Sequence, residues 1–340
     1  MNALSIAPAT PIGAVGAGRM GRGMAIAFAW AGLPVRLIDA RPREPARWQA
    51  LRNEIDADLR GNLAAMAALG TIDQAGIEAL LARIEVIGNP DADAAMAGCP
   101  VIFEGVPETL EAKREALGRI ARAAHPQAII ASTTSTMLST ELAAFVHGPQ
   151  RFLNAHWLNP AWIIPIVEVS PHSATDASVT DALCALLEQA GKVPVRCAAA
   201  PGYIVPRLQA LIMNEAARMV EEGVASAEEI DKATRHGLGL RFAAIGVLEF
   251  IDFGGADILY HASRYLSARL DADRYALPAS IDAMMKENRL GLRTGQGFYD
   301  WQARGAGDPR QDVLARTLGM LKHAGLYRPP AGSQPEALKD

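Results

Sequence analysis

The sequence has no long apolar run. Its most apolar segment, residues 24–33, is interrupted by Gly32 and followed by Pro34, whereas a membrane-spanning helix needs roughly 18 consecutive apolar residues. Residues 1–11 carry no basic side chain, so a secretory signal peptide is not expected either. We therefore expect a cytoplasmic protein with no membrane partner.

Cysteine is scarce, at three residues in 340. Cys99, Cys184 and Cys197 lie far apart and form neither a CxxC pair nor a zinc-binding pattern, and an odd count does not suit a disulfide framework. No local signature would activate one of them as a nucleophile. We expect buried thiols that pack as small apolar side chains, and no metal site.

Aromatic residues make up only 6% of the chain, and neither sign of charge is in clear excess. Lysine and arginine number 33 against 37 acidic residues, which gives a formal net charge of −4. Proteins whose main partner is a nucleic acid usually carry a basic surface. The composition therefore excludes nucleic acid as the main partner.

The chain does contain enough apolar residues for a large core. Half of its residues are hydrophobic and 21% are charged, which excludes a disordered chain. A length of 340 residues predicts about two domains.

Up to about residue 200, short apolar runs alternate with amphipathic segments. This alternation predicts an α/β fold, a Rossmann-type doubly wound sheet that is mostly parallel and carries helices on both faces. Strands are predicted at residues 12–15, 35–38, 84–87, 101–103, 128–131, 152–156, 166–169 and 193–197. Helices are predicted at residues 20–30, 46–69, 73–83, 109–124 and 176–190, with another that begins at residue 139.

After residue 200 the strand signal disappears and helical periodicity takes over. Helices are predicted at residues 208–222, 227–236, 258–270, 280–288 and 312–323. We predict an α/β domain over residues 1–199, an all-α C-terminal domain over residues 200–325 and a flexible tail over residues 326–340. Residues 208–219 and 245–253 are very apolar for free-standing helices, so we expect them to pack across the two-fold interface of a homodimer.

The motif Gly16-x-Gly18-x-x-Gly21 follows the first predicted strand and opens the first predicted helix. In a dinucleotide-binding turn, the first glycine permits the tight turn and the second lets the backbone approach the pyrophosphate. The third allows the helix to pack closely on the strand. The helix N-terminus supplies unpaired N–H groups and a positive dipole end. We therefore predict that residues 1–199 bind a dinucleotide.

Asp39 ends the second predicted strand, 18 residues after Gly21. Its carboxylate can accept both ribose hydroxyls of an adenosine and would repel a 2′-phosphate, which favours NAD over NADP. The neighbouring Arg19 and Arg41 act in the opposite direction. NAD is the predicted cofactor, and FAD fits less well because the second domain is predicted to bind a substrate rather than a flavin ring.

Three further residues suit the oxidation of an alcohol. His156 ends one predicted strand, Glu168 lies in the next strand, and Ser135 lies in a Ser/Thr-rich turn after an earlier strand. A histidine can take the hydroxyl proton as hydride leaves the carbon. A carboxylate can orient the histidine ring, and a serine hydroxyl can hold the substrate oxygen. Taken singly, each residue also has a structural interpretation, such as a buried strand histidine or a helix-capping serine.

Together, these motifs resemble the 3-hydroxyacyl-CoA dehydrogenase family over residues 13–301. The resemblance rests on GAGRMG, GVPE with Lys113 five residues after its glutamate, the turn at Ser135, HWLNP, IVEVSP, PGYIVPR and GLRTGQGFYDW. It implies an N-terminal Rossmann-type domain that binds NAD and a helical C-terminal domain that forms a dimer.

The resemblance also implies roles for single residues. His156 would be the general base paired with Glu168, and Ser135 would lie near the substrate oxygen. Arg293 stands where the family usually has a lysine near the cofactor. The implied NAD-binding residues are Gly16, Gly18, Arg19, Met20, Gly21, Asp39, Glu108, Lys113, Asn159 and Arg293.

Pro206 departs from the family pattern, which usually has an asparagine there that hydrogen-bonds on the substrate side. Proline offers no such side chain, so the contact would come from elsewhere, such as Asn214, or be absent. Residues 220–226 and 237–242 look closer to the gulonate dehydrogenase and lambda-crystallin branch, which acts on free 3-hydroxy acids. The segment 291–301 looks like the CoA-linked members.

The nature of the substrate carrier stays open at this point. Residues 46–63 correspond to the region that touches CoA in the family, and a CoA site would prefer a basic excess toward the 3′-phosphate. The charges there are mixed: Arg47, Arg52 and Arg60 stand against Glu54, Asp56 and Asp58.

We expect NAD-dependent oxidation of a short (S)-3-hydroxyacyl-CoA, such as 3-hydroxybutyryl-CoA, to the 3-oxoacyl-CoA. One alternative is a dehydrogenase of a free polar or aromatic 3-hydroxy acid, gulonate- or carnitine-like. Another is a non-catalytic structural protein that binds NAD. Trp157 and Trp162 flank the catalytic strand end, and we expect them to pack in the core, the alternative being an aromatic wall against the substrate.

Overall fold

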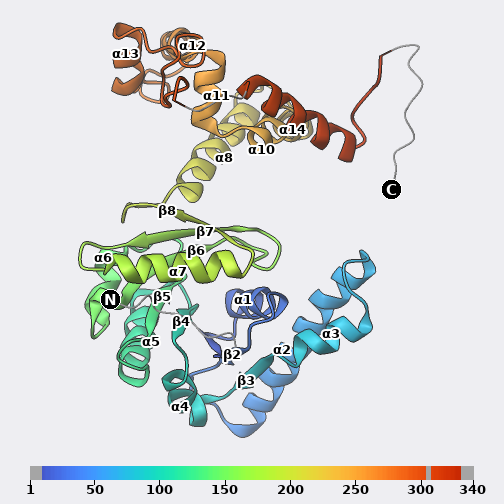
Figure 1. The fold of residues 1–340 in the computed structure, drawn as a ribbon, viewed down its shortest axis with the longest axis vertical. Helices are drawn as coiled ribbons and strands as arrows, with labels where there is room; N and C mark the ends of the chain where they lie inside the picture. The colour runs from blue at the N-terminus through green and yellow to red at the C-terminus, as the bar shows by residue number, and fades with distance from the viewer. Residues whose placement is uncertain (1–9, 304–307, 331–340) are drawn as a thin grey trace. The chain divides into compact units, whose positions relative to one another are not determined.

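The computed structural model describes residues 10–303 and 308–330 (Figure 1). Its contacts divide the chain into two compact units, residues 1–213 and residues 214–340. The domain boundary near residue 200 stays a prediction. Most of the tail predicted over residues 326–340 lies outside the described residues.

The first unit is built on one eight-stranded sheet in the order β3-β2-β1-β4-β5-β6-β7-β8. All neighbouring strands are parallel except β6 and β7, which are antiparallel. The predicted doubly wound sheet is confirmed, and parallel strands bring the loops after β1, β2, β4, β5 and β6 to one edge. The strands are β1 (Ile12–Val15), β2 (Val35–Ile38), β3 (Ile84–Ile87), β4 (Val101–Glu104), β5 (Ile129–Ser132), β6 (Phe152–Trp157), β7 (Ile166–Pro171) and β8 (Val193–Arg196).

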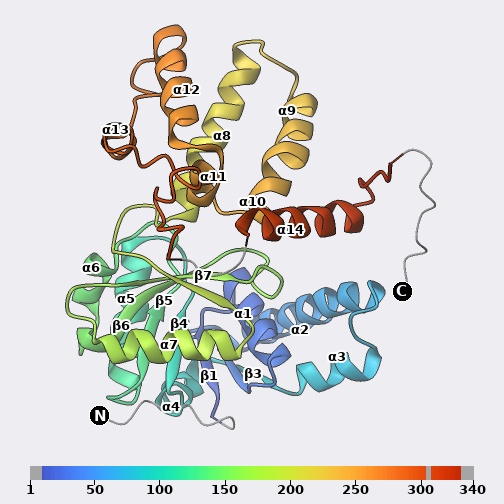
Figure 2. The same ribbon diagram turned by 45° about the horizontal axis from the view of Figure 1, so that its top comes forward.

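Helices connect most of these strands, and two of them begin at side-chain caps. Asp73 accepts the N–H of Gly76 at 2.7 Å, as its predicted capping position requires, and Thr109 accepts the N–H of Ala112 at 3.3 Å. Helices α2 and α3 lie side by side in both views (Figures 1 and 2). The helices of this unit are α1 (Arg19–Trp30), α2 (Pro45–Ala68), α3 (Gln74–Leu81), α4 (Ala92–Ala97), α5 (Leu110–Ala123), α6 (Ser139–Leu142) and α7 (Ala177–Gln189).

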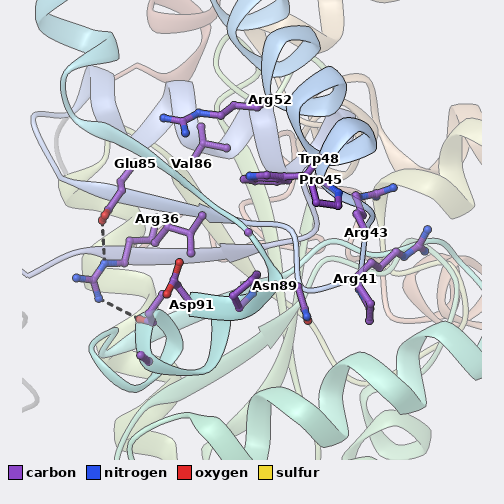
Figure 3. Close-up of a pocket in the computed structure, with 16 residues that line it drawn as sticks. Arg36, Arg41, Arg43, Pro45, Trp48, Arg52, Glu85, Val86, Asn89 and Asp91 are labelled. Carbon is purple, nitrogen blue, oxygen red and sulfur yellow. Dashed lines mark hydrogen bonds and ion pairs between the residues drawn. The ribbon is translucent and has the colours of Figure 1, made fainter.

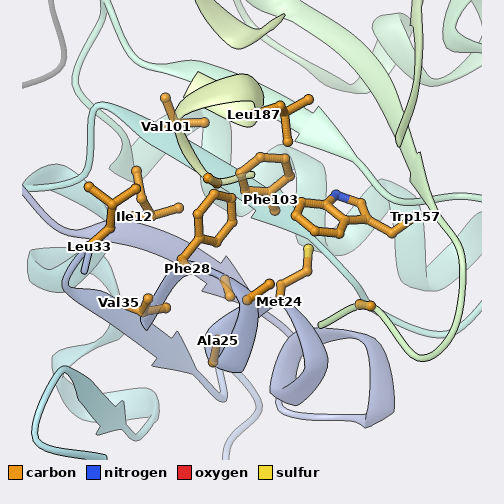
Figure 4. Close-up of a cluster of buried hydrophobic side chains, with 14 of the residues drawn as sticks. Ile12, Met24, Ala25, Phe28, Leu33, Val35, Val101, Phe103, Trp157 and Leu187 are labelled. Carbon is orange, nitrogen blue, oxygen red and sulfur yellow. The ribbon is translucent and has the colours of Figure 1, made fainter. Parts of the chain in front are cut away.

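Two hydrophobic clusters cover the two faces of the sheet, since alternate residues of a strand point to opposite faces. One cluster contains Ile12 and Ala14 of β1, and the other contains Val15. Phe28 and Phe103 pack against Trp157 in the first cluster, with ring centroids 5.5 and 5.7 Å from the indole (Figure 4). Trp157 is fully buried there, so its predicted packing role is confirmed.

The second unit is helical among its described residues, which carry only isolated β-bridges. Helix α8 (Val205–Glu221) crosses the division between the units. The helix predicted over residues 227–236 is wrong at its end, because α9 stops at Ala233 and a π-helical turn, Thr234–Gly239, follows. The remaining helices are α10 (Leu240–Ala244), α11 (Val247–Gly254), α12 (Ala256–Arg269), α13 (Ala279–Lys286) and α14 (Pro309–His323).

The segment GLRTGQGFYDW, residues 291–301, is held by one buried carboxylate of the second unit, Asp252. Asp252 accepts the backbone N–H groups of Phe298 and Tyr299 and the indole N–H of Trp301, each at 2.9 Å. A Cβ at Gly297 would lie 2.3 Å from Asp252 Oδ1, so this segment can close on the carboxylate only with glycine at that position.

Three predictions from composition concern membrane-spanning helices, cysteines and metal sites. No helix in the described ranges has both the length and the apolar composition needed to cross a bilayer. Cys99 and Cys184 are buried free thiols, and Cys197 is half-buried. Among the described side chains, no cluster of three or more histidine, cysteine or acidic groups could hold a metal ion.

Candidate active site

The predicted dinucleotide turn lies at the carboxyl end of β1. Gly16 has a φ of +112°, and a Cβ there would lie 2.6 Å from the carbonyl oxygen of Gly105. A Cβ at Gly21 would lie 1.9 Å from the carbonyl oxygen of Gly16, so helix and turn touch through their backbones. A Cβ at Gly18 would meet nothing within 4 Å. The open space at Gly18 therefore suits an approaching pyrophosphate.

A cavity of about 420 Å³ extends from this turn to Asp39. Gly18 precedes α1 and caps it without a side-chain hydrogen bond, which leaves the helix N-terminus available to an anion. Asp39 directly follows the carboxyl end of β2 and is almost fully buried. The residues fit the adenosine and pyrophosphate groups of NAD.

Asp39 has a partner that the sequence prediction missed. Arg43, four residues along, forms an ion pair with its carboxylate, and a second contact joins Arg43 Nη2 to Asp39 Oδ1 at 3.3 Å. The hydrogen bond from Arg43 to Asp39 raises the pKa of the Arg43 guanidinium. Arg43 therefore partly neutralises the carboxylate that would receive the ribose.

A second cavity, of about 630 Å³, adjoins this end of the sheet and shares Arg41 and Arg43 with the first. Figure 3 shows Arg52 on one side of the indole of Trp48 and Arg43 on the other. Arg36 is held by Glu85 at 3.2 Å, whereas Arg41 and Arg52 make no side-chain hydrogen bond or ion pair within the described part of the chain. The rim of this second cavity is therefore positive, which favours an anionic ligand.

The histidine and glutamate predicted as a pair stand opposite each other on neighbouring strands. His156 of β6 and Glu168 of β7 are register partners in the antiparallel ladder, and His156 Nδ1 lies 2.8 Å from Glu168 Oε2. Glu168 Oε1 accepts the backbone N–H groups of Ile204 and Val205 at 2.9 and 2.8 Å. With Nδ1 engaged, Nε2 is the nitrogen of His156 that remains free to exchange a proton.

Glu108 holds the loop that carries Ser135. Its Oε1 accepts the N–H of Ser135 at 2.9 Å, the N–H of Thr136 at 3.1 Å and the hydroxyl of Thr134. Burial alone would raise the pKa of Glu108, but the hydrogen bond from Thr134 and the charge of Lys113 lower it below its ordinary value. Glu108 is therefore an ionised clamp on the Ser135 loop.

Lys113 belongs to a charge network with Glu104 and Glu108. It is fully buried, with Nζ 2.9 Å from Glu104 Oε1 and 3.5 Å from Glu108 Oε2. It lines neither the cavity that extends from the glycine turn to Asp39 nor a separate cavity that is lined by His156. Lys113 thus reaches the site through Glu108, and direct contact with NAD stays a prediction.

The first unit brings most of the predicted catalytic and nicotinamide-side residues to one cavity of about 460 Å³. Pro206 and Gln209, one helical turn apart on α8, also line it, and Gln209 supplies the polar side chain that Pro206 lacks. Asn214, the substitute considered from the sequence, does not line this cavity. The predicted residues in the lining are Arg19, Met20, Glu108, Ser135, His156 and Asn159.

Arg293 lies in the second unit and is not among the residues that line these two cavities. Its Nη2 lies 2.8 Å from Asp257 Oδ2, and this hydrogen bond lowers the pKa of Asp257. Its role with the cofactor stays a prediction.

The sequence prediction missed Arg43, Glu104, Tyr203 and Gln209. The i, i+4 spacing of Asp39 and Arg43 was a readable signal. Pro206 stands before the helix predicted from residue 208, so its i, i+3 relation to Gln209 appears only in α8. Glu104 and Tyr203 gave no signal, because partners such as Ser132 of Glu104 and Thr134 of Tyr203 lie 28 and 69 residues away along the chain.

Comparison with known proteins bears on both units. The family described as "3-hydroxyacyl-CoA dehydrogenase, NAD binding domain" matches residues 11–200, and its "C-terminal domain" matches residues 202–301. The 3-hydroxyadipyl-CoA dehydrogenase of Escherichia coli (strain K12) is 32% identical over 86% of this chain, which spans only 59% of that protein's length. The lambda-crystallin homolog of Bos taurus is 33% identical, over 75% of this chain and 77% of that protein.

Further similarity comes from full-length relatives. A probable 3-hydroxybutyryl-CoA dehydrogenase of Bacillus subtilis (strain 168) is 31% identical over 85% of this chain and 96% of its own. Among solved structures, a 3-hydroxyacyl-CoA dehydrogenase from Archaeoglobus fulgidus superposes with a TM-score of 0.73 at 29% identity, over 94% of this chain and 100% of that one.

Proposed function

The chain belongs to the 3-hydroxyacyl-CoA dehydrogenase family, NAD-binding oxidoreductases that act on CH–OH groups, and we propose that it oxidises a short (S)-3-hydroxyacyl-CoA, such as 3-hydroxybutyryl-CoA, to the 3-oxoacyl-CoA. The observation that carries this proposal is the hydrogen-bonded pair of His156 and Glu168, which shares one cavity with Ser135.

His156 does the proton chemistry. Glu168 accepts a hydrogen bond from the Nδ1–H of His156 and fixes the tautomer, so the lone pair of Nε2 can take the hydroxyl proton of the substrate. Ser135 donates its hydroxyl hydrogen to the substrate oxygen and holds it near Nε2. NAD, when bound, would accept the hydride from the substrate carbon that carries this oxygen. That carbon becomes the carbonyl carbon. Glu168 also stabilises the imidazolium that forms.

The residues that would hold NAD lie at one edge of the sheet. Gly16, Gly18 and the N-terminus of α1 would receive the pyrophosphate, and Asp39 would receive the adenosine ribose. Arg19, Met20, Glu108 and Asn159 line the cavity at His156 and would border the nicotinamide half.

The ion pairs of α2 support a CoA carrier, because they neutralise the acidic residues of this helix and leave two arginines over. Two of its acidic residues, Glu54 and Asp58, form ion pairs with the buried Arg22 of α1 at 2.8 and 3.6 Å. The third, Asp56, pairs with Arg60. The cations of this helix that have no ion-pair partner among the described residues are Arg47 and Arg52, which could attract a phosphate.

A free 3-hydroxy acid is the second candidate substrate. Arg19 lines the cavity at His156 and makes no side-chain hydrogen bond or ion pair within the described residues, so its guanidinium could bind a carboxylate. Pro206 lines the same cavity in place of the family's asparagine. A purely structural protein is a weaker candidate, because the dyad is intact and open to a cavity.

Initial rates of NADH formation separate the two substrates, with 3-hydroxybutyryl-CoA tested against gulonate and carnitine. We expect turnover of the CoA ester, and we expect Arg47→Gln with Arg52→Gln to raise its KM about two- to fivefold. Arg83→Gln, which removes another exposed arginine, is the matched control. Turnover of a free acid but of no CoA ester would replace this proposal with the second candidate.

We also propose that the protein acts as a homodimer and that a second copy covers the exposed apolar side of α8. Helix α8 has no buried residue, and Leu208, Leu211 and Ile212 stand at the i, i+3 and i+4 positions of one stripe. Exposed stripes of this kind mark interaction surfaces. Cytoplasmic localisation stays a prediction.

A further inference from the structure

Tyr203 lies at a turn that serves the catalytic pair in several ways. It is buried and has a φ of 44°, directly after Gly202 with a φ of 73°. Left-handed backbone is uncommon for a residue with a bulky side chain and persists where the surroundings enforce it. This turn brings the next two backbone N–H groups, of Ile204 and Val205, onto Glu168.

The ring of Tyr203 covers one face of the His156 imidazole. The two ring centroids are 5.2 Å apart, and the planes differ by only 7°. Glu168 restrains the same imidazole in its plane through Nδ1. The two contacts together leave the His156 ring little freedom to rotate, so Nε2 keeps its direction into the cavity.

The hydroxyl of Tyr203 joins the histidine strand to the serine loop. It accepts the side-chain N–H of Asn154, two residues before His156 on β6, at 2.9 Å. Its own hydrogen can go to the carbonyl of Thr134, the residue before Ser135, at 3.0 Å. Burial raises the pKa of Tyr203, so the hydroxyl keeps the hydrogen that this second bond needs.

We infer that Tyr203 is a positioning residue that fixes the distance between His156 and Ser135, its ring acting on the imidazole and its hydroxyl on the Ser135 loop. The inference rests on the proposed roles of His156 and Ser135. Its two halves are separable, because phenylalanine keeps the ring and removes only the hydroxyl, whereas leucine removes both.

Steady-state kinetics test the hydroxyl. In Tyr203→Phe we expect kcat to fall about tenfold, the effect of one misplaced hydrogen-bonded loop, while the dissociation constant of NADH and the KM stay close to the wild type. Tyr260→Phe is the matched control, because it removes a hydroxyl that Arg264 binds in the second unit. A Tyr203→Phe enzyme with wild-type kcat overturns the hydroxyl's role.

Proton NMR of His156 tests the ring without relying on turnover. A proton over an aromatic face resonates upfield, so the His156 ring signals, assigned by their loss in His156→Gln, should move downfield in Tyr203→Leu and stay in place in Tyr203→Phe. Unmoved signals in a folded Tyr203→Leu overturn the stacking. If the wild type oxidises no 3-hydroxy substrate, the proposed function fails, and these signals still decide whether Tyr203 holds His156.

Discussion

At the scale of single residues, the site contains two carboxylates whose positions are fixed by hydrogen bonds within the protein. Glu168 accepts two backbone N–H groups with one oxygen and faces His156 with the other. Glu108 does the equivalent for the Ser135 loop. Such preorganisation lets a group act on the transition state without reorienting at the moment of reaction.

The lowered pKa of Glu108 gives a pH prediction with a definite sign. Its pKa in the folded chain lies below the ordinary glutamate value of about 4.3. The ionised clamp therefore contributes stability above that value, and the contribution is lost as the pH falls through the lowered pKa. We expect the free energy of unfolding to fall more steeply on acidification in the wild type than in Glu108→Gln.

Denaturant unfolding at a series of pH values checks this expectation, with Glu111→Gln as the control on the next helix. If the free energy of unfolding falls equally with pH in the wild type and in Glu108→Gln, the loop contacts do not lower the pKa of Glu108.

Sequence reasoning selected His156 and Glu168 as a candidate pair by residue type and strand position, and the two side chains are hydrogen-bonded in the structure. It also placed Trp157 in the core, where the indole is fully buried. It could not find how Glu104, Lys113 and Glu108 share one buried charge network. That network depends on the side chains of a strand, a helix and a loop meeting in space, which spacing along the chain does not encode.

At the scale of elements, the two glycines of the turn before α1 have different surroundings, one open to a ligand and the other packed against backbone. Gly18 faces open space, and Gly21 faces the carbonyl of Gly16. We expect Gly18→Val to weaken NADH binding at least tenfold with little change in Tm, because its φ of −82° suits any residue. We expect Gly21→Ala to lower Tm, because its Cβ would overlap backbone.

Fluorescence titration of NADH and thermal unfolding of the two variants give the comparison. A Gly18→Val protein that binds NADH as the wild type does would show that the pyrophosphate lies elsewhere.

The segment at residues 291–301 is held by a contact within the second unit. Asp252 is fully buried and accepts three N–H groups at 2.9 Å. Its removal takes the shared acceptor away from three part-buried donors, at a cost of about 1–3 kcal/mol for each one that water cannot reach. We expect Asp252→Ala to lower the free energy of unfolding by about 3 kcal/mol or more.

Denaturant unfolding measures this loss, and Asp282→Asn, on the surface of α13, is its control. A stability change in Asp252→Ala no larger than that of the control would contradict the assigned role.

The strands were readable as apolar runs bounded by turn residues, and β1, β2 and β3 have their predicted bounds. The six-residue helix α4 was missed, since it is too short for a helical period to emerge. The helix predicted from Ser139 is a single turn. The π-helical turn after α9 has no signature in the pattern of apolar residues.

At the scale of the whole molecule, the alternating pattern and its end near residue 200 predicted a sheet-containing part followed by helices. The described residues have this order. The apolar surface on α8 needs a further explanation, because Leu211 is 60% and Met213 67% exposed in the single chain. The proposed homodimer would supply one, because a second copy would cover this surface.

We expect a dimer in sedimentation equilibrium at micromolar concentration. Leu211→Glu should weaken it, because a charge would be buried in an apolar interface, whereas Leu69→Glu, at a lone exposed leucine after α2, should not. A monomeric wild type would contradict the proposed assembly.

The central claim is that His156, held by Glu168, takes the proton from a 3-hydroxyl group while NAD takes the hydride. The most direct measurement is the rate of NADH formation from 3-hydroxybutyryl-CoA by the wild type, His156→Gln and Glu168→Gln, together with the dissociation constant of NADH for each. The account predicts that both substitutions lower kcat by about 10²–10⁴-fold and leave NADH binding nearly unchanged. Turnover by His156→Gln at the wild-type rate would contradict it.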